Sequence, residues 1–440
     1  MSLLSFKGGI HPPHEKKYTE KKAVVKAVDP KVVTISMRQH IGAPCNPIVK
    51  KGDYVKVGQM VGEATSFVSS PVHSSVSGTV KEVTNKNVLG GKAMCVVIES
   101  DGENLIHETV VSNGDISGLS SKEILEIIKN AGIVGMGGAG FPTHVKLSPP
   151  PEKKIDVVIL NGAECEPYLT ADHRLMLETP AEVVYGLRAL IKVLNVQKGY
   201  IGIENNKPDA FKSISEAAKE YPEIEVVELY TKYPQGAEKQ LIYACTKREV
   251  PSAGLPMDAG AVVSNVATSA AIANAIKTGM PLVERICTIT GSSVVEPKNM
   301  LIKVGTNIKE IIDQCGGYKG KVGKLIMGGP MMGLASNTDN IPSTKTTSGI
   351  LIFNEDEAKI PEAENCLKCG KCVSICPSFL EPLYISAYAL KNDFEKAEKY
   401  NALDCIECGS CSFVCPSKRP LLHSIRVAKK EIIAKRRKSK

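Results

Sequence analysis

Eight of the fourteen cysteines in this sequence fall into two runs with identical spacing, CLKCGKCVSICP and CIECGSCSFVCP. Each ligand position in the second run lies 39 residues after its counterpart in the first. C-x2-C-x2-C-x3-C-P spacing is typical of chains that bind two [4Fe-4S] clusters, in which three thiolates of a run hold one cluster and the fourth ligates the other. Structural zinc, the alternative, usually pairs two C-x2-C knuckles across a longer gap. We therefore assign two ligand sets: Cys366, Cys369, Cys372 and Cys415, and Cys405, Cys408, Cys411 and Cys376.

The segment between the two cysteine runs is expected to be helical. In LYISAYALKNDFEKAEKYNALD, apolar and aromatic residues recur at helical intervals, at Leu383, Ile385, Tyr388, Leu390 and Phe394. Two clusters in one small helical module can pass electrons singly, because each cluster exchanges one electron at a time and does not accept a hydride. Such a module requires other redox groups at its two ends.

A second stretch, GIVGMGGAGFPTHVKL at residues 132–147, places Gly135, Gly137 and Gly140 in G-x-G-x-x-G spacing. A dinucleotide-binding turn with this spacing follows a buried strand and opens a helix. Here the upstream SSKEILEIIKNAG predicts an amphipathic helix with Ser121 as its N-cap, and the Phe-Pro pair downstream stops a helix at once. The glycines are therefore predicted to form a loop between a helix and an extended segment, with a glycine-rich surface turn as the alternative.

The middle of the chain alternates apolar strands with helical segments. IDVVILNGA, GYIGIEN and IEVVELY are typical of a parallel sheet that helices cover on both faces. TPAEVVYGLRALIKVLN predicts a helix with a capping box between Thr179 and Glu182 and with Pro180 at its first position. Two carboxylates, Glu164 and Glu166, follow the carboxyl end of the first strand, where open α/β sheets bind ligands. Solvated loop charges are the alternative for this pair.

Taken together, these motifs carry a family resemblance. GMGGAGFPTHVK resembles the flavin loop of the NADH-binding flavoprotein subunit of respiratory complex I, and NGAECEP, YPQGAEKQL and SNVAT are similar to its later motifs in the same order. With two cysteine runs and a preceding sheet-like domain, the chain most closely resembles the RnfC family, which belongs to the Rnf electron-transport complex. The resemblance implies a multidomain α/β and α+β fold with a variant Rossmann-like domain for FMN and NAD(H). It also implies a peripheral subunit, on the cytoplasmic face of the cell membrane, of a complex that couples ferredoxin:NAD+ electron transfer to ion translocation.

The resemblance further implies roles for individual residues. Glu166 is expected to be the catalytic residue that orients the nicotinamide against the flavin. Asn265 and Thr268 are expected to hold the FMN phosphate, and Lys146 is expected to lie beside the FMN. The other cofactor-binding positions implied by the family are Gly135, Gly137, Gly138, Gly140, Phe141, Asn161, Glu164, Tyr233 and Glu238. FMN is expected to bind non-covalently and NAD(H) to be the substrate, with the other Rnf subunits and, indirectly, ferredoxin as partners.

The flanking regions complete the predicted organisation. NPIVKKGDYVKVGQMVGE and SSPVHSSVSGTVKEV resemble the halves of a barrel-sandwich hybrid of the biotinyl or lipoyl type. No lysine stands in SPVHSSVSG at the expected hairpin centre, so a docking or structural role is favoured over a carrier role. Short strands around NIKEIIDQCG are similar to a β-grasp domain. The expected divisions are 1–112 (barrel-sandwich hybrid), 113–280 (FMN and NAD(H) domain), 281–340 (β-grasp), 341–360 (linker), 361–425 (helical two-cluster ferredoxin-type module) and 426–440 (basic tail).

Composition limits the possible functions. The 440 residues contain no run of about 20 apolar residues, so no membrane-spanning helix is expected. Most of the net charge of +8 lies in the tail, so a broad nucleic-acid-binding face is not expected. The tail is expected to be solvated and disordered, with docking to anionic lipid or an acidic partner as the alternative. The start of the chain lacks a signal-peptide pattern, so the thiols are expected to be reduced.

Electron counting leads to the expected function. NAD(H) carries two electrons as a hydride and the clusters carry one, so a flavin, which can do both, is expected between them. Two other functions fit the motifs. One is the NADH-dependent flavin and iron–sulfur input subunit of a soluble hydrogenase or dehydrogenase, and the other is a non-catalytic ferredoxin-type electron carrier or scaffold.

Overall fold

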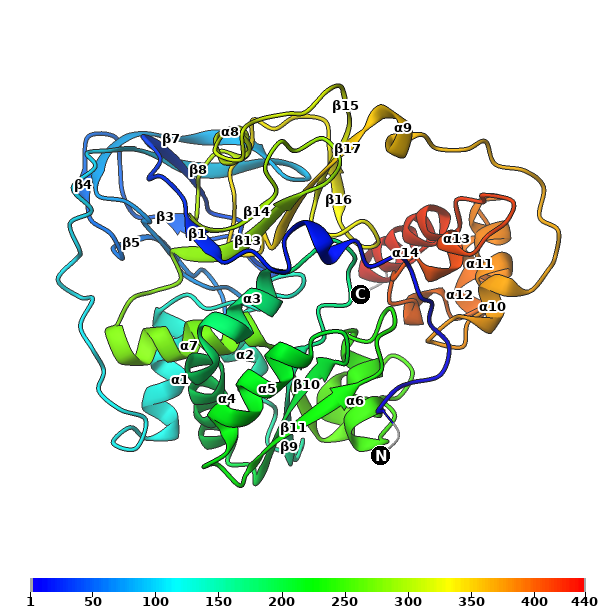
Figure 1. Cartoon of the computed structure of the whole chain (residues 1–440), viewed down its shortest axis with the longest axis horizontal. Helices are drawn as coiled ribbons and strands as arrows, with labels where there is room; N and C mark the ends of the chain where they lie inside the picture. Colours follow the sequence, from blue (N-terminus) through cyan, green and yellow to red (C-terminus); the bar gives the residue numbers. More distant parts are fainter. Residues whose placement is uncertain (1–2, 439–440) are drawn as a thin grey trace.

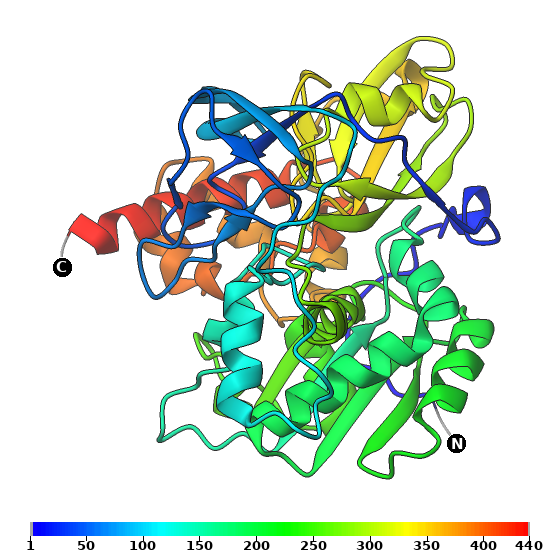
Figure 2. The same cartoon turned by 90° about the vertical axis from the view of Figure 1, so that its left-hand side faces the viewer.

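The computed structural model describes residues 3–438, which form four parts (Figure 1). In that view a layer of helices and a parallel sheet lies at the bottom, two β-rich parts lie above it, and a small helical part lies at the right. Figure 2 shows the same parts from the side, with the C-terminal helix extending outward. Each part has a cluster of buried apolar side chains of its own.

The N-terminal part contains two small antiparallel sheets, with strand orders β2-β8-β7-β4 and β3-β5-β6. The strands are β2 (Val32–Ser36), β3 (Asn46–Pro47), β4 (Tyr54–Val55), β5 (Met60–Glu63), β6 (Val72–His73), β7 (Gly78–Val88) and β8 (Gly91–Ser100). Val33, Ile35, Val96 and Ile98 alternate along β2 and β8 and are fully buried in one cluster. The predicted barrel-sandwich architecture is confirmed.

The second part is built on a four-stranded parallel sheet with the order β11-β10-β9-β12. The strands are β9 (Val157–Gly162), β10 (Lys198–Glu204), β11 (Ile224–Leu229) and β12 (Ala261–Asn265). One face packs against α1 (Ser121–Asn130), α3 (Ala171–Glu178), α4 (Pro180–Leu194), α5 (Pro208–Ala218) and α7 (Val266–Thr278), and the other packs against α6 (Glu238–Thr246). The chain adds β10 and β11 on one side of β9 and then returns to add β12 on the other. The strand order therefore reverses between β9 and β12.

Two predicted details at the start of this part differ from the structure. The N-cap of α1 is Ser120 rather than Ser121, and Ser120 forms a capping box with Glu123. The glycine loop is followed not by an extended segment but by a one-turn helix, α2 (Thr143–Lys146). Proline is tolerated at the start of a helix because a backbone N–H there has no acceptor within the helix. Pro142 can therefore stand directly before α2.

The capping box predicted for α4 is also wrong, although Pro180 does occupy the first helical position. The Thr179 hydroxyl donates to the carbonyl oxygen of Leu175, at 3.1 Å. The Glu182 carboxylate pairs with Lys277 on α7, at 2.9 Å. The Thr179 side chain is therefore bonded to the preceding helix α3 and the Glu182 side chain to α7, so neither forms the capping box.

The third part is a six-stranded mixed sheet with the order β1-β14-β13-β17-β15-β16. Its strands are β1 (Val24–Lys26), β13 (Glu284–Thr290), β14 (Lys298–Lys303), β15 (Val322–Met327), β16 (Leu334–Ser336) and β17 (Gly349–Asn354), with the helix α8 (Ile308–Asp313) packed on them. The predicted β-grasp strands and helix are present. However, the 341–360 segment, expected to be a linker, contains β17 and the short α9 (Glu355–Ala358), and β1 comes from the N-terminal region.

The helical part repeats one backbone conformation in its two cysteine runs. The one-turn helices α10 (Lys371–Ser374) and α13 (Ser410–Phe413) follow Gly370 and Gly409, which have φ values of +75° and +79°. Between the runs lie α11 (Pro382–Ala389) and α12 (Phe394–Lys399), as the helical spacing predicted. The similar φ values show that equal cysteine spacing produces equal loop geometry.

The C-terminal region differs from the expected disordered tail. Within the described residues it forms α14 (Leu421–Lys438), and Ile432 is buried against the helical part. Lys435 and Arg436 pair with Glu395 and Glu398 on α12. None of the helices in residues 3–438 has the length and apolar character needed to cross a membrane.

Candidate functional site

The strand reversal places a cleft at the carboxyl edge of the parallel sheet, which is where open α/β sheets bind ligands. Asn161 on β9 and Asn265 on β12 are paired neighbours in the register at this edge. The cleft has a volume of about 530 Å³. The structure gathers twelve of the thirteen predicted FMN and NAD(H) residues along it: Gly135, Gly137, Gly138, Gly140, Phe141, Lys146, Asn161, Glu164, Glu166, Tyr233, Glu238 and Asn265.

Three glycines of the loop differ in what a side chain would meet at their positions. A Cβ on Gly137 would lie 2.7 Å from Nδ2 of Asn265, so the loop packs directly on the end of β12. Gly140 has a φ of +72°, which disfavours any side chain. Gly138 has nothing within 4 Å of an added Cβ, so its open side faces the cleft. This open backbone is suited to the close approach of a planar ligand.

Thr268 is the predicted residue that does not line the cleft. Its side chain is buried on α7, and its hydroxyl accepts a hydrogen bond from the N–H of Met136 at 2.9 Å. Thr268 therefore supports the glycine loop from beneath. Asn265 caps α7 by accepting from the N–H of Ala267 at 2.9 Å, and this helix N-terminus is the part of the cleft edge best suited to an anion.

Glu164 binds backbone groups at the start of α3. Its carboxylate accepts from the N–H of Asp172 at 2.7 Å and from the N–H of His173 at 3.2 Å. On the other side, the buried Lys16 ammonium lies 4.0 Å from the Glu164 carboxylate and donates to the carbonyl oxygen of Leu169 at 2.5 Å. Burial lowers the pKa of Lys16, and Glu164 opposes that shift. Lys16 lies about 150 positions earlier in the sequence, and no motif identified it.

Glu166 connects the cleft to the β-grasp sheet. Its carboxylate accepts from the N–H groups of Met331 and Met332, at 3.0 and 2.8 Å, in the turn between β15 and β16. Burial raises the pKa of Glu166 to about 7, while these two hydrogen bonds act in the opposite direction. The carboxylate therefore lies at the cleft wall and fixes the adjacent turn.

Asp172 is a cleft residue that the sequence analysis missed. Asn265 donates to its carboxylate at 2.7 Å, and burial together with repulsion from Glu164 raises the pKa of Asp172 to about 7. Acidic residues are common in the first turn of a helix, so nothing in its local sequence distinguishes it. Its position becomes informative only because β12 brings Asn265 beside α3.

A basic group also lines this cleft. Lys146, on α2, donates to the Glu238 carboxylate at 2.9 Å and to the carbonyl oxygen of Val263 at 3.0 Å. Glu238 is the first residue of α6. The sequence analysis grouped Lys146 and Glu238 by resemblance, and the fold brings them into direct contact.

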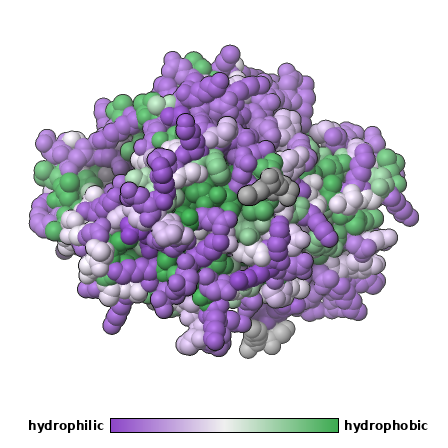
Figure 3. Space-filling model, turned by 60° about the horizontal axis from the view of Figure 1, so that its bottom comes forward, coloured by the Kyte–Doolittle hydropathy of each residue, from purple (hydrophilic) through white to green (hydrophobic). Residues whose placement is uncertain are grey.

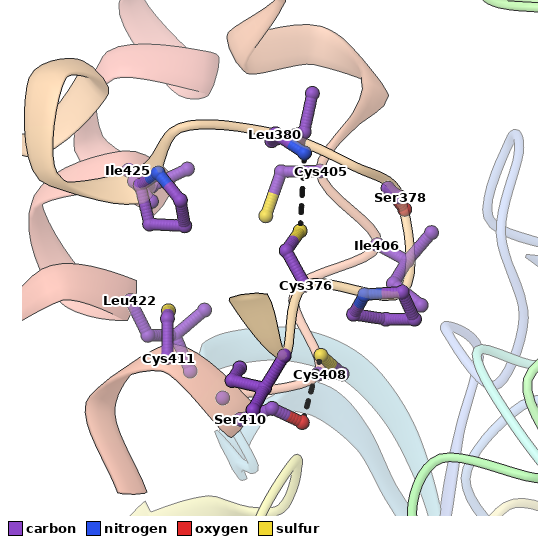
Figure 4. Close-up of a pocket in the computed structure, with 14 residues that line it drawn as sticks. Cys376, Ser378, Leu380, Cys405, Ile406, Cys408, Ser410, Cys411, Leu422 and Ile425 are labelled. Atoms are coloured by element: carbon purple, nitrogen blue, oxygen red, sulfur yellow. Dashed lines mark hydrogen bonds between the residues drawn. The ribbon is translucent and has the colours of Figure 1, made fainter. Parts of the chain in front are cut away.

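A second pocket is lined by one of the two cysteine sets (Figure 4). Cys376, from the first run, lies with the three cysteines of the second run, Cys405, Cys408 and Cys411. The walls are apolar and include Leu380 and Ile425, and backbone N–H groups donate to the sulfurs, for example from Leu380 to Cys376 at 3.4 Å. Four thiols with N–H donors in an apolar enclosure fit the requirements of a [4Fe-4S] cluster.

The other predicted set lies closer to solvent. Cys366 and Cys369 are exposed, and the pKa of Cys372 is raised first by burial and then by the neighbouring Cys415 and Cys366 thiols. Cys415, from the second run, therefore lies beside first-run cysteines. Within residues 3–438 no three His, Cys, Asp or Glu side chains are spaced as ligands of one metal ion.

The cleft and the enclosed cysteine pocket share a wall. Ile406, which follows Cys405, lines both spaces. Beside it, the buried Tyr233 lines the cleft, and its hydroxyl donates to the carbonyl oxygen of Cys408 at 2.7 Å. A redox group in the cleft would therefore be separated from the enclosed pocket by one layer of side chains.

Four family descriptions match separate parts of the chain. Residues 4–103 match the RnfC barrel sandwich hybrid domain, residues 128–274 the Nuo51 FMN-binding domain, residues 286–335 the SLBB domain, and residues 358–434 the 4Fe-4S dicluster domain. The matches follow one another in the same order as the four parts of the structure.

Curated relatives match the chain over almost its whole length. It is 53% identical to the C subunit of the Na(+)-translocating ferredoxin:NAD(+) oxidoreductase complex of Acetobacterium woodii, over 99% of this chain and 98% of the relative. It is 50% identical to the C subunit of the proton-translocating ferredoxin:NAD(+) oxidoreductase complex of Clostridium ljungdahlii, over 98% and 94%. A chain of a solved NAD+-reducing [NiFe]-hydrogenase aligns at 18% identity with a TM-score of 0.48, covering 72% of this chain and 61% of that one.

Proposed function

The chain belongs to the RnfC family of ion-translocating ferredoxin:NAD(+) oxidoreductase complexes, and we propose that it transfers electrons between NAD(H) and iron–sulfur clusters within such a complex. The observation that carries this proposal is the shared wall at Ile406. A cleft suited to a flavin and a nicotinamide lies directly beside a pocket lined by four cysteines. This adjacency is what a protein needs to convert hydride transfer into single-electron transfer.

FMN is the cofactor that the cleft would hold. When bound, FMN supplies the exchange between a two-electron hydride and single electrons. The N-terminus of α7, capped by Asn265, would bind the phosphate, and the open side of Gly138 would let the ring approach the backbone. The Lys146 ammonium would also line the FMN site, as would the carboxylate of Asp172.

The carboxylates would shape the nicotinamide side of the cleft. Glu166 holds the Met331–Met332 turn through two backbone hydrogen bonds, so it can position that turn even when no nucleotide is present. Direct contact between Glu166 and the nicotinamide remains a prediction. Glu164 holds the first turn of α3 and thereby orients Asp172 toward Asn265.

The clusters would act in a fixed order. The enclosed set with Cys376, Cys405, Cys408 and Cys411 would hold the cluster next to the cleft, since Ile406 and Tyr233 separate the two. The set with Cys366, Cys369, Cys372 and Cys415 would hold the outer cluster, where Cys366 and Cys369 are exposed. Electrons would enter or leave the chain at the exposed end, through another subunit and, indirectly, ferredoxin.

Cofactor content tests this proposal. Full-length protein purified without oxygen should contain about one FMN and about eight irons per chain, since two four-iron clusters are assigned. NADH should then bleach the flavin absorbance and produce the electron paramagnetic resonance signals of two interacting reduced clusters. Protein that lacks flavin, or that contains zinc in place of iron, would contradict the proposal.

The chain would act as a peripheral subunit at the cytoplasmic face of the membrane, where NAD(H) is available. Hydrophilic side chains predominate on the face in Figure 3, and the apolar ones lie in scattered patches. The basic end of α14 could add a weak contact with anionic headgroups, of about 1 kcal/mol per basic residue near the surface. Attachment would depend mainly on the integral-membrane subunits of the complex.

Cell fractionation tests this localisation. Expressed alone, the chain should be recovered in the soluble fraction after a high-salt wash, because salt screens the contacts that α14 can make. Co-expressed with the membrane subunits, it should stay with the membranes through the same wash. Salt-resistant membrane binding by the isolated chain would contradict the peripheral assignment.

A further inference from the structure

The segment Ser70–Gly78 of the N-terminal part is buried, although it occupies the place where a carrier domain of this architecture would expose its hairpin. It contains β6 and has no lysine of its own. Other parts of the chain cover it: Ser75 donates to the carbonyl oxygen of Val304 at 2.6 Å, and Pro71 accepts from Lys345 at 2.7 Å. The segment is therefore a contact surface in this chain.

Lys345 is an unusual residue at this contact. It is 1% exposed, and its Nζ donates to the carbonyl oxygens of Pro71 at 2.7 Å and Gly132 at 2.6 Å. In the described chain, no ion pair joins it to a carboxylate, and burial lowers its pKa to about 7. A buried lysine is costly unless it is well bonded, so these two hydrogen bonds account for its position.

Gly132 lies at the start of the glycine loop, just after α1 and its C-cap Ala131. The other end of the loop, at Gly140, contacts a different segment of the N-terminal part and the segment that carries Lys345. The N–H of Ile41 donates to the carbonyl oxygen of Gly140 at 3.3 Å. A Cβ on Gly140 would lie 2.8 Å from Cγ2 of Thr346, so the segment that carries Lys345 also packs here. The N-terminal part and residues 345–346 therefore contact both ends of the loop.

The middle of the loop is also bonded, through Arg285, to the segment that carries Lys345. Arg285, which is 3% exposed, donates from Nη1 to the carbonyl oxygen of Met136 at 3.3 Å and to that of Lys345 at 2.7 Å. The N–H of Lys345 donates to the side-chain oxygen of Gln39 at 3.0 Å. Lys345 is therefore bonded at its backbone N–H, its carbonyl oxygen and its side chain, and each bond leads toward the loop or the N-terminal part.

We propose that the N-terminal part and Lys345 form a clamp that holds the glycine loop in its flavin-binding shape, with Lys345 as the positioning residue. This inference rests on the proposed function, because it assumes that the loop binds FMN. It gives the barrel-sandwich part a role: the Ser70–Gly78 segment supplies the fixed surface against which the loop is held. Lys345 is not among the residues that line the cleft, and it would act through Gly132 and Arg285.

The test is the FMN affinity of full-length Lys345→Met. Methionine has an unbranched side chain of similar length, but it has no ammonium group, so the two hydrogen bonds to Pro71 and Gly132 are lost. We expect FMN to bind about tenfold more weakly, as expected for losing two net hydrogen bonds that hold the loop. Lys192→Met is the matched control, because Lys192 also donates to two carbonyl oxygens, those of Ile116 and Ser117, away from the cleft. Its FMN affinity should equal that of the wild type.

The melting temperature and the far-ultraviolet circular dichroism spectrum report folding in each variant, and iron content shows separately that the part with the cysteine pockets is intact. If Lys345→Met does not fold, Gln39→Leu removes the acceptor of the Lys345 N–H and should weaken FMN binding in the same direction. Wild-type FMN affinity in a folded Lys345→Met or Gln39→Leu protein overturns the clamp alone. Failure of the wild type itself to bind FMN overturns the proposed function and the clamp with it.

Discussion

Replacing Cys376 with serine is expected to remove the cluster assigned to the second cysteine run, although Cys376 belongs to the first. Cys376 lies in the enclosed pocket with Cys405, Cys408 and Cys411, and a serine hydroxyl is a much poorer ligand for iron than a thiolate. Iron should fall from about eight to about four per chain. FMN should be retained, and NADH should no longer reduce the remaining cluster, because the enclosed cluster stands between it and the cleft.

The matched variant is Cys415→Ser, which removes a second-run cysteine assigned to the outer cluster. It should lose about the same amount of iron, yet NADH should still reduce the enclosed cluster beside Ile406 and Tyr233. Electron paramagnetic resonance after NADH addition separates the two variants. If each serine damaged the cluster of its own run, the crossed assignment would be wrong.

Gly138→Ala is expected to cause a large loss of FMN with little effect on folding. An added Cβ at Gly138 meets no protein atom within 4 Å, so the polypeptide alone accommodates it. A flavin lying against this part of the loop would meet the new methyl group, and overpacking of this kind costs about 1–3 kcal/mol. We therefore expect FMN affinity to fall about 5-fold to 150-fold, as measured by fluorescence titration of the flavin.

Gly118→Ala is the control for this substitution. Its nearest contact to an added Cβ is the carbonyl oxygen of Asp115 at 3.7 Å, and it lies outside the cleft. Both variants should keep the iron content and melting temperature of the wild type. Unchanged FMN affinity in Gly138→Ala would remove the open side of the glycine loop from the flavin site.

The cysteine runs could be interpreted from the sequence because their geometry is local. Each run encodes its own loop, and the matching left-handed residues Gly370 and Gly409 show that the same spacing produces the same conformation twice. The strand and helix order was predictable for a similar reason. Open α/β sheets bind ligands at the carboxyl ends of their strands, which indicated a site at Glu164 and Glu166, and both residues line the cleft.

Contacts between distant segments could not be predicted in this way. Thr179 and Glu182 have the spacing of a capping box, but Leu175 and Lys277 take their side chains. Residues 341–360 look like a polar linker, yet β17 within them pairs with β13 and β15 in the centre of a sheet. Lys277 and the neighbours of β17 are distant in the sequence, and each offers an ion pair or a burial that the local pattern does not show.

The sequence by itself determined the two cysteine runs and the order of the parts, because ligand spacing and the pattern of strands and helices are local properties of the chain. The crossed ligand sets stay a prediction, and the family resemblance indicated most of the residues at the cleft. Only the tertiary structure decided how those residues are used. It turned Thr268 away from the cleft, brought Asp172 beside Asn265, and placed Lys345 against Gly132 more than 200 positions earlier. These arrangements depend on which surfaces the separate parts bury against one another, and that is set by the packing of the whole chain.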